Sequence, residues 1–160
     1  MTISNFKKGS GLVEVVVGLA IIFTSIFVLI KTYNYYLKVA LSHKGDVQAS
    51  ILLEEGVEVI KILRDSSWDT KIAVLTPGTY YSLAYTGSTW TATTTNNYID
   101  GVFNRTFVLG EVYRDTNDEI SLSGTSDIGT RKVTVFVSYL TLFGTTTKQM
   151  SAYITNLFNN

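Results

Sequence analysis

The chain has no cysteine, one histidine and one proline among its 160 residues. Without cysteine it can form no disulfide bond, and it lacks the thiol to which a lipoprotein attaches its lipid. With His43 as the only histidine, no catalytic triad or zinc site of the usual composition can be assembled. The glycines match neither the P-loop nor the dinucleotide-binding spacing. We therefore predict no enzyme, no cofactor and no resident metal.

An excess of charge of either sign is also missing, because 13 basic and 13 acidic residues balance to zero. A dedicated nucleic-acid binder carries a clear basic excess, so no specific nucleic acid is predicted as a partner. In one acidic stretch, Asp115, Asn117 and Glu119 place oxygen atoms at alternate positions, as calcium loops do. The stretch lacks the glycine and the distant glutamate of an EF-hand. We predict a solvated turn between strands, with a calcium site at these residues as the alternative.

The absence of proline before Pro77 permits one long N-terminal helix. Its first part is the 19-residue run from Leu12 to Ile30, in which only four residues are not plainly apolar. These four are Glu14, Gly18, Thr24 and Ser25. A helix rises about 1.5 Å per residue and needs about 20 apolar residues to cross a bilayer. The run is therefore predicted to be a membrane-spanning helix.

Two other structures could contain such a run. A buried core helix is one, but so short a chain has little core with which to surround a helix that is apolar on all sides. A cleaved secretory signal is the other, but its apolar part usually spans only about 7–15 residues. In addition, Lys31, Thr32 and Tyr33 follow the run where a signal would have small residues for cleavage. We favour a retained anchor.

The few charges around the run predict its orientation and expose an anomaly. Lys7 and Lys8 come directly before it, which favours a cytoplasmic N-terminus and export of the rest. Glu14 lies inside the run, where a carboxylate costs about 2.5–3.5 kcal/mol at a helix centre and less near an end. No lysine or arginine lies between Glu14 and Lys31. We expect its cationic partner on another chain, or at a new N-terminus made by cleavage nearby.

The sequence Lys7-Lys8-Gly9, a further four residues, Glu14 and a long apolar helix together resemble the N-terminal motif of type IV pilins and pseudopilins. In that family a prepilin peptidase cuts after the glycine and methylates the new amine, and the glutamate is the fifth mature residue. The resemblance implies cleavage between Gly9 and Ser10, N-methylation of Ser10, and attraction of a neighbouring subunit's amine by Glu14. A cut after Gly11 would leave Glu14 only third. The family usually has phenylalanine where this chain has Ser10, and often threonine where it has Gly11.

The resemblance also implies partners and a location. The partners are the prepilin peptidase, other pilin subunits, the inner-membrane assembly machinery, and the lipid bilayer before assembly. The chain would be a single-pass protein of the cytoplasmic (inner) membrane with its N-terminus inside, and later part of an extracytoplasmic filament at the cell surface. The stretches Glu55–Glu58 and Leu63–Trp68 are more similar to minor pilins or pseudopilins than to a major pilin.

The second part of the predicted helix, which as a whole runs from about Ser10 to Arg64, is amphipathic. One apolar stripe contains Ala49, Leu52, Leu53, Gly56, Ile60 and Leu63. The other side contains Glu54, Glu55, Glu58, Lys61 and Arg64, of which Glu58 and Lys61 can form an ion pair. Gly45 and Gly56 are expected to loosen the helix locally.

After Pro77 the composition changes to the tyrosine, threonine, valine and phenylalanine typical of strands. The predicted strands are Thr79–Tyr85, Ser88–Thr93, Val102–Tyr113 with a possible break at Gly110, Ile120–Leu122, Arg131–Phe143 and Lys148–Phe158. No helix separates them, so they should form an antiparallel sheet. The fold class is α+β: a long N-terminal α-helix packed against a C-terminal antiparallel β-sheet, as in pilins. The mixed pattern around Val133–Leu140 leaves open which face of that strand meets the helix.

These predictions divide the chain into a leader (1–9), a hydrophobic helix (10–31), an amphipathic helix (32–65) and an exported β-rich domain (66–160). The leading functional hypothesis is a structural subunit of a type IV pilus or related filament. The alternative is a single-pass membrane-anchored extracytoplasmic binding or adhesion domain that does not polymerise. This alternative explains the helix and the sheet but gives Glu14 no role.

Overall fold

The computed structural model describes residues 7–141 and 144–158, with side chains from residue 11 onward. Its two helices are α1 (Lys7–Ser66) and α2 (Trp68–Lys71). Its strands are β1 (Tyr80–Thr86), β2 (Thr89–Thr93), β3 (Tyr98–Ile99), β4 (Phe103–Arg114), β5 (Ile120–Ser121), β6 (Thr125–Thr141) and β7 (Gly144–Thr155). The strands form one seven-stranded antiparallel sheet, and the α+β prediction is confirmed.

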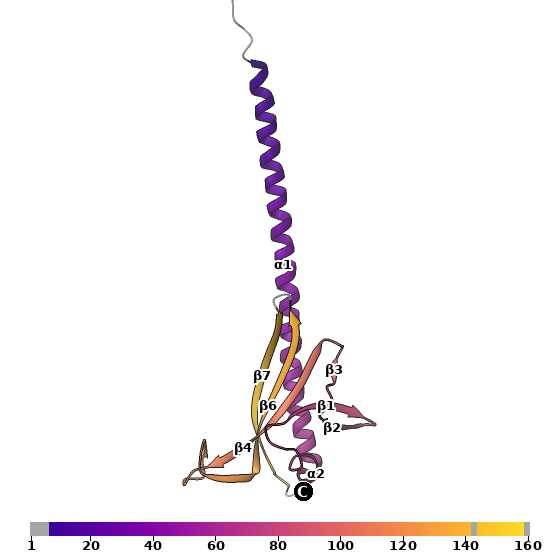
Figure 1. Ribbon diagram of the computed structural model, residues 1–160, viewed down its shortest axis with the longest axis vertical. Helices are drawn as coiled ribbons and strands as arrows, with labels where there is room; N and C mark the ends of the chain where they lie inside the picture. The colour runs from indigo at the N-terminus through magenta and orange to yellow at the C-terminus, as the bar shows by residue number, and fades with distance from the viewer. Residues whose placement is uncertain (1–6, 142–143, 159–160) are drawn as a thin grey trace, which may run out of the picture. The chain divides into compact units, whose positions relative to one another are not determined.

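The sheet has the order β2-β1-β4-β6-β7, with β3 and β5 paired to β4 (Figure 1). Every pair is antiparallel, and two-residue connections join β1 to β2 and β6 to β7. The two longest pairings are β4 with β6 and β6 with β7. Strand β7 is an edge of the sheet, paired on one side only.

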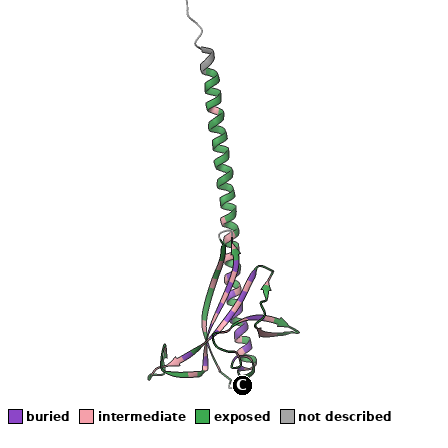
Figure 2. Cartoon of the chain, in the orientation of Figure 1, coloured by how far each residue is buried: buried purple, intermediate pink, exposed green. Residues whose placement is uncertain are grey.

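The core lies between the part of α1 that follows Lys44 and one face of the sheet (Figure 2). The apolar side chains buried from α1 are Ala49, Leu53, Val57, Val59, Ile60 and Leu63. Those buried from β4 and β6 are Phe103, Phe107, Leu109, Val112, Val133, Val135, Val137 and Tyr139. The predicted apolar stripe of the helix is thus confirmed. The structure also decides what the sequence left open, since the valine side of β6 faces the helix.

Helix α1 passes through both of its central glycines without interruption, so the expected local loosening was wrong. Each glycine instead lies under a side chain of β6. A Cβ added at Gly45 would lie 3.1 Å from the ring of Tyr139, and one added at Gly56 would lie 2.8 Å from Val135 Cγ1. The glycines allow the sheet to approach the helix closely, and packing offsets their low helix propensity.

The serines and aspartates of residues 65–69 predict a turn at the end of α1, but the chain continues there into a second, short helix. Ser67 caps a further short helix, α2, by accepting a hydrogen bond from the amide of Thr70 at 3.3 Å. This cap turns Trp68 into the core, where it is 3% exposed. A four-residue helix has no periodic pattern, so the sequence signalled only its cap.

Several strand limits also differ from prediction. Strand β4 continues through Gly110 without a break, and its irregularity is a register shift with β6 between Glu111 and Tyr113. Beyond this shift β4 pairs with Thr125 and Ser126, so β6 begins earlier than the predicted Arg131. The first residues of β6 have side chains typical of turns, and they adopt a strand conformation only because β4 pairs with them. The short strand β3 was not predicted, and residues 142–143 of the last hairpin lie outside the described residues.

The chain forms two compact units, one ending at His43 and one beginning at Lys44. The first contains the apolar part of α1. The second contains the rest of α1, with α2 and the sheet. His43 is exposed.

Candidate membrane and assembly helix

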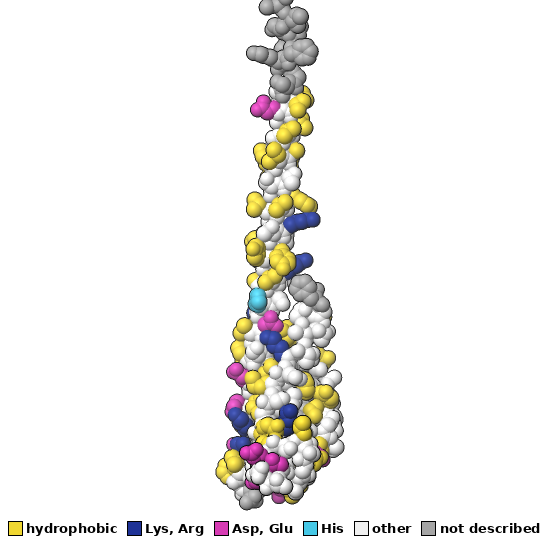
Figure 3. All heavy atoms as spheres, turned by 90° about the vertical axis from the view of Figure 1, so that its left-hand side faces the viewer, with side chains coloured by type: hydrophobic (Ala, Val, Ile, Leu, Met, Phe, Trp, Pro, Cys, Tyr) yellow, Lys and Arg dark blue, Asp and Glu magenta, His cyan; other side chains and the backbone are white. Residues whose placement is uncertain are grey.

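The first unit presents its apolar side chains on its surface. None of residues 11–43 is buried, and Leu12, Phe23 and Leu29 are 66–70% exposed. Figure 3 shows hydrophobic side chains along this part of α1. Covering one such side chain gains about 1.5–3 kcal/mol, so a surface of this kind requires lipid or protein around it. By length and composition this part of α1 could span a membrane and serve as an anchor.

The two hydroxyl groups in the apolar run have partners within the helix. Thr24 Oγ1 donates to the carbonyl oxygen of Ala20 at 2.7 Å, and Ser25 Oγ donates to that of Ile21 at 2.8 Å. Such bonds to the preceding turn are ordinary for serine and threonine in apolar helices. They remove the need for water at these positions, so neither residue opposes burial in a bilayer.

Glu14 is the exception on this surface. Its side chain is exposed, and no described residue forms an ion pair with it. The next cation along the chain is Lys31, 17 residues later and about 25 Å away at the helical rise. Covering this surface with lipid or protein would therefore leave the carboxylate in need of a cation from elsewhere.

The predicted processing residues lie in the first turns of α1. The backbone of Lys7, Lys8, Gly9 and Ser10 is helical, and their side chains lie outside the described residues. The proposed roles of these four residues therefore remain predictions.

The acidic stretch with the alternative calcium site forms a turn between β4 and β5. Asp115 Oδ1 accepts hydrogen bonds from the amides of Asn117 at 2.8 Å and Glu119 at 3.0 Å. The carboxylate of Asp115 therefore stabilises the turn through these two hydrogen bonds. Within residues 11–141 and 144–158 no three histidine, aspartate or glutamate side chains are grouped closely enough to hold a metal ion.

A cation of the protein lies beside this turn. Arg114 Nε is 2.7 Å from Asp127 Oδ2 and 3.6 Å from Asp118 Oδ1. Its Nη1 donates to the Asp118 carbonyl oxygen at 2.7 Å. The hydrogen bond from Arg114 is the main reason why the pKa of Asp127 is lowered, and the same bond raises the pKa of Arg114.

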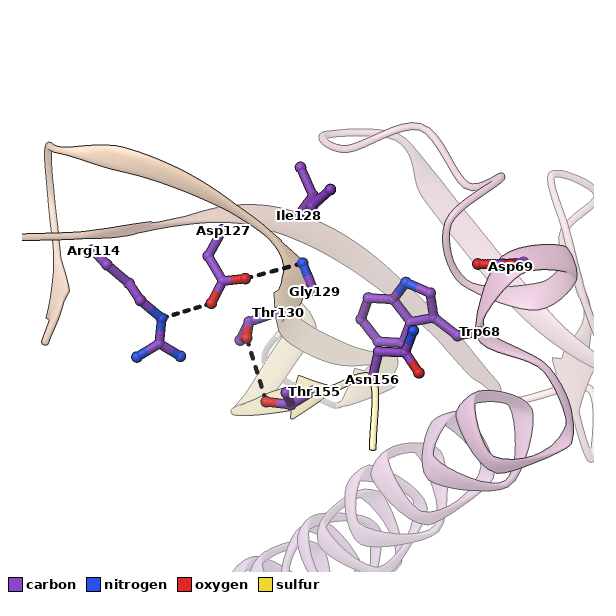
Figure 4. Close-up of a pocket in the computed structure, with 9 residues that line it drawn as sticks. All are labelled: Trp68, Asp69, Arg114, Asp127, Ile128, Gly129, Thr130, Thr155 and Asn156. Atoms are coloured by element: carbon purple, nitrogen blue, oxygen red, sulfur yellow. Dashed lines mark hydrogen bonds and ion pairs between the residues drawn. The ribbon is translucent and has the colours of Figure 1, made fainter. Parts of the chain in front are cut away.

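Arg114 and Asp127 also line a pocket of about 350 Å³ (Figure 4). The other residues around it are Trp68, Asp69, Ile128, Gly129, Thr130, Thr155 and Asn156. Both oxygens of Asp127 are engaged, one by Arg114 and one by the amide of Gly129 at 3.0 Å. Thr130 and Thr155 join their hydroxyls across β6 and β7 at 3.4 Å. The polar groups thus bind one another. The pocket joins four segments that are distant in the chain, so no local sequence pattern could predict it.

Polar contacts also join α1 to the sheet inside the second unit. Tyr139 Oη donates to Asp46 Oδ1, and Lys148 Nζ donates to the Asp46 carbonyl oxygen at 3.0 Å. Burial, followed by the bond to Asp46, raises the pKa of Tyr139 to about 12. Further along, Arg105 is 4% exposed and places Nη1 2.9 Å from Glu55 Oε2. The predicted Glu58–Lys61 pair is present at 2.6 Å.

No protein-family model, no curated protein and no solved structure matches this chain. Only the N-terminal motif and the structure of each unit therefore bear on its function.

Proposed function

We propose that this protein is a structural subunit, of the minor pilin or pseudopilin kind, of a type IV pilus or a related filament. The observation that carries the proposal is Glu14, which forms no ion pair with any described residue, on an exposed apolar helix that follows Lys7-Lys8-Gly9. A simple anchor needs the apolar helix but gains nothing from a carboxylate inside it. A subunit that packs helix against helix can give that carboxylate a cationic partner.

In this proposal the leader is temporary. A prepilin peptidase cuts between Gly9 and Ser10 and methylates the amine of Ser10. The mature chain then begins with a cation four residues before Glu14, about 6 Å along a helix. Two parallel helices displaced by about one turn can therefore bring the Ser10 amine of one chain to the Glu14 carboxylate of the next. In a medium of low dielectric constant this attraction is much stronger than in water.

The cleavage also changes the fate of the apolar surface. Before assembly lipid covers the side chains between Leu12 and Ile30, and in the filament the same side chains pack against other subunits. The second unit remains folded around its own core, because its burial does not depend on residues before Lys44. An inner-membrane assembly machinery would perform the transfer.

The orientation in the membrane follows from the resemblance rather than from the lysines alone. Lys7 and Lys8 precede the apolar run, but Lys31, Lys38 and Lys44 follow it. Positive charge therefore flanks both ends, and the bias that orients many single-pass proteins is weak here. Prepilin peptidase processing requires the leader in the cytoplasm, and the proposal adopts that orientation.

Two measurements test the function. Mass spectrometry of the membrane-extracted chain should give an N-terminus at methylated Ser10, whereas retention of Met1 or Lys7 would rule out pilin-type processing. In cells, Glu14→Ala should enter the membrane normally and fail to enter sheared filaments. Glu54→Ala is the matched control, because Glu54 is also an exposed glutamate of α1 and lies outside the apolar run. If Glu14→Ala is incorporated as well as Glu54→Ala, the anchored non-polymerising domain becomes the better account.

A further inference from the structure

The segment directly after the apolar run combines aromatic rings with positive charge. Residues 31–38 contain Lys31, Tyr33, Tyr35, Tyr36 and Lys38. All five side chains are exposed on α1 within the first unit. No acidic residue occurs anywhere between Glu14 and Asp46. We call residues 31–38 the collar.

We propose that the collar binds anionic lipid headgroups at the membrane face where the apolar run ends and sets the depth of the helix before assembly. This inference rests on the membrane-anchored stage of the proposed function. Tyrosine prefers the membrane–water interface because its ring is apolar and its hydroxyl group needs water. Lysine near an anionic surface adds an attraction that depends on lipid charge.

The axial spacing places the collar at the headgroup layer. The 19 residues from Leu12 to Ile30 span about 28 Å, close to the roughly 30 Å of a hydrocarbon core. The three tyrosines follow within about 9 Å of Ile30 and lie within about 5 Å of one another along the axis. Lys38 lies about 12 Å beyond Ile30, so its charge is within roughly a Debye length of the headgroups at physiological salt.

The angular distribution fits a helix that crosses the interface. At about 100° per residue, Lys31, Tyr35 and Lys38 lie on one side of the helix, while Tyr33 and Tyr36 lie on the opposite side. A helix lying flat on a membrane would collect its aromatic residues on one face and its lysines on the other. Here the two lysines share one side, but the rings lie on both sides of the axis and Tyr35 lies beside the lysines, which fits a crossing helix better than a flat one.

The described contacts of this segment leave its charge available. Lys31 Nζ lies 4.6 Å from the centre of the Phe27 ring, so the side chain reaches back along the end of the apolar run. The Asn34 amide nitrogen donates to the carbonyl oxygen of Ile30 at 3.0 Å. This bond keeps the only amide side chain of the collar engaged with the helix. The lysine charges are the remaining strong ligands for phosphate groups.

Lipid selectivity of the full chain tests the proposal. The chain is reconstituted into phosphatidylcholine vesicles that contain phosphatidylglycerol, and electron spin resonance measures which spin-labelled lipid is restricted at its surface. The wild-type chain should prefer labelled phosphatidylglycerol over labelled phosphatidylcholine, and less so at high salt. Lys31→Gln and Lys38→Gln should each reduce this preference, by up to about fivefold, the factor equivalent to roughly 1 kcal/mol per lysine.

Lys44→Gln is the matched control. Lys44 is an exposed lysine of the same helix, but it lies six residues further along the chain than Lys38. Its substitution should leave the lipid preference unchanged. Equal losses from all three substitutions, or no preference in the wild-type chain, would overturn the proposal. Displacement of the labelled lipid by added duplex DNA would assign the lysines to nucleic acid and would also overturn it.

The same samples test the lipid preference of the collar independently of membrane insertion. Resistance of the wild-type chain to alkaline extraction reports insertion independently of lipid charge. An inserted chain without preference for anionic lipid contradicts the collar and leaves the filament proposal standing. A chain that is extracted contradicts the membrane-anchored stage and the collar with it.

Discussion

At the scale of single residues, Gly56 shows how closely the helix and the sheet approach each other. An added Cβ would lie 2.8 Å from Val135 Cγ1 and 3.2 Å from Arg105 Cδ. Both neighbours are buried, and Arg105 is also paired with Glu55. Neither can move away without disturbing the core. A residue that weakens an isolated helix therefore stabilises this one through packing.

We expect Gly56→Ala to lower the free energy of unfolding by about 1–2 kcal/mol, because overpacking outweighs the gain in helix propensity. The measurement is urea unfolding of the solubilised chain, followed by tryptophan fluorescence. Trp68 and Trp90 both lie in the second unit, so the signal reports that unit alone. Gly110→Ala is the control, since its Cβ would meet only ordinary contacts, the nearest at 3.6 Å. Unchanged stability in Gly56→Ala would contradict the close approach.

Asp127 gives a second residue-scale prediction. Its side chain is 19% exposed, and the hydrogen bond from Arg114 lowers its pKa. A carboxyl group with a lowered pKa stabilises the fold above its unfolded-state pKa of about 3.9, and this contribution is lost as the pH falls through the folded pKa. We expect Asp127→Asn to reduce the free energy of unfolding by about 1 kcal/mol at neutral pH.

The pH dependence distinguishes this effect from a general loss of packing. Stability curves of wild type and Asp127→Asn should converge as the pH falls through the lowered pKa of Asp127, where the wild-type side chain also becomes protonated. Asp100→Asn serves as control, because Asp100 is exposed and its φ of 52° suits asparagine equally well. A difference between wild type and Asp127→Asn that persists in acid would mean that the charge is not the cause.

At the scale of elements, the junction of α1 with β6 and β7 depends on a polar contact at the beginning of the second unit. Tyr139 from β6 and Lys148 from β7 both reach Asp46 of α1. The contact lies where the helix first meets the sheet. The buried apolar stripe begins at Ala49, directly after it.

The tyrosine gives this junction a pH dependence at the alkaline end. Tyr139 is 4% exposed and its pKa is raised to about 12, so the neutral phenol is favoured in the fold. The stabilisation is complete below the unfolded-state pKa of about 10 and is lost as the pH rises towards 12. Carbon NMR of the tyrosine ring should show one signal titrating near pH 12 that is absent in Tyr139→Phe. Tyr81→Phe is the control, and titration of every tyrosine near pH 10 would contradict the assignment.

At the scale of the whole molecule, the two units differ in where their apolar side chains lie. The first exposes its apolar side chains, whereas the second buries a core of its own. We expect residues 44–160 to be soluble and monomeric without detergent, whereas the full chain should require detergent or lipid. The reason is that the large exposed apolar side chains are concentrated in residues 12–41. Sedimentation and circular dichroism of the two chains check this. Aggregation of residues 44–160 would show that the second unit depends on the first.

Local sequence patterns were sufficient to predict the helix and the presence of the sheet. The signals were a proline-free apolar run, a stripe at helical spacing and a change to strand-forming residues. These are local patterns, and their periodicity predicts the type of secondary structure. Glu14 could be identified as an anomaly for the same reason, because a single charge in an apolar run is recognised without tertiary information. Most strands were predicted to within a few residues.

Tertiary structure alone decided which side chains meet. The alternation along β6 offers two faces of similar character, and only packing against α1 selected Val133, Val135 and Val137 for burial. The early start of β6 depends on β4 lying beside it, and the grouping of Arg114 with Asp127 depends on the register of the same two strands. Gly45 and Gly56 appeared to weaken the helix until the sheet was placed above them. Each of these outcomes depends on contacts between residues far apart in the chain, which no local pattern records.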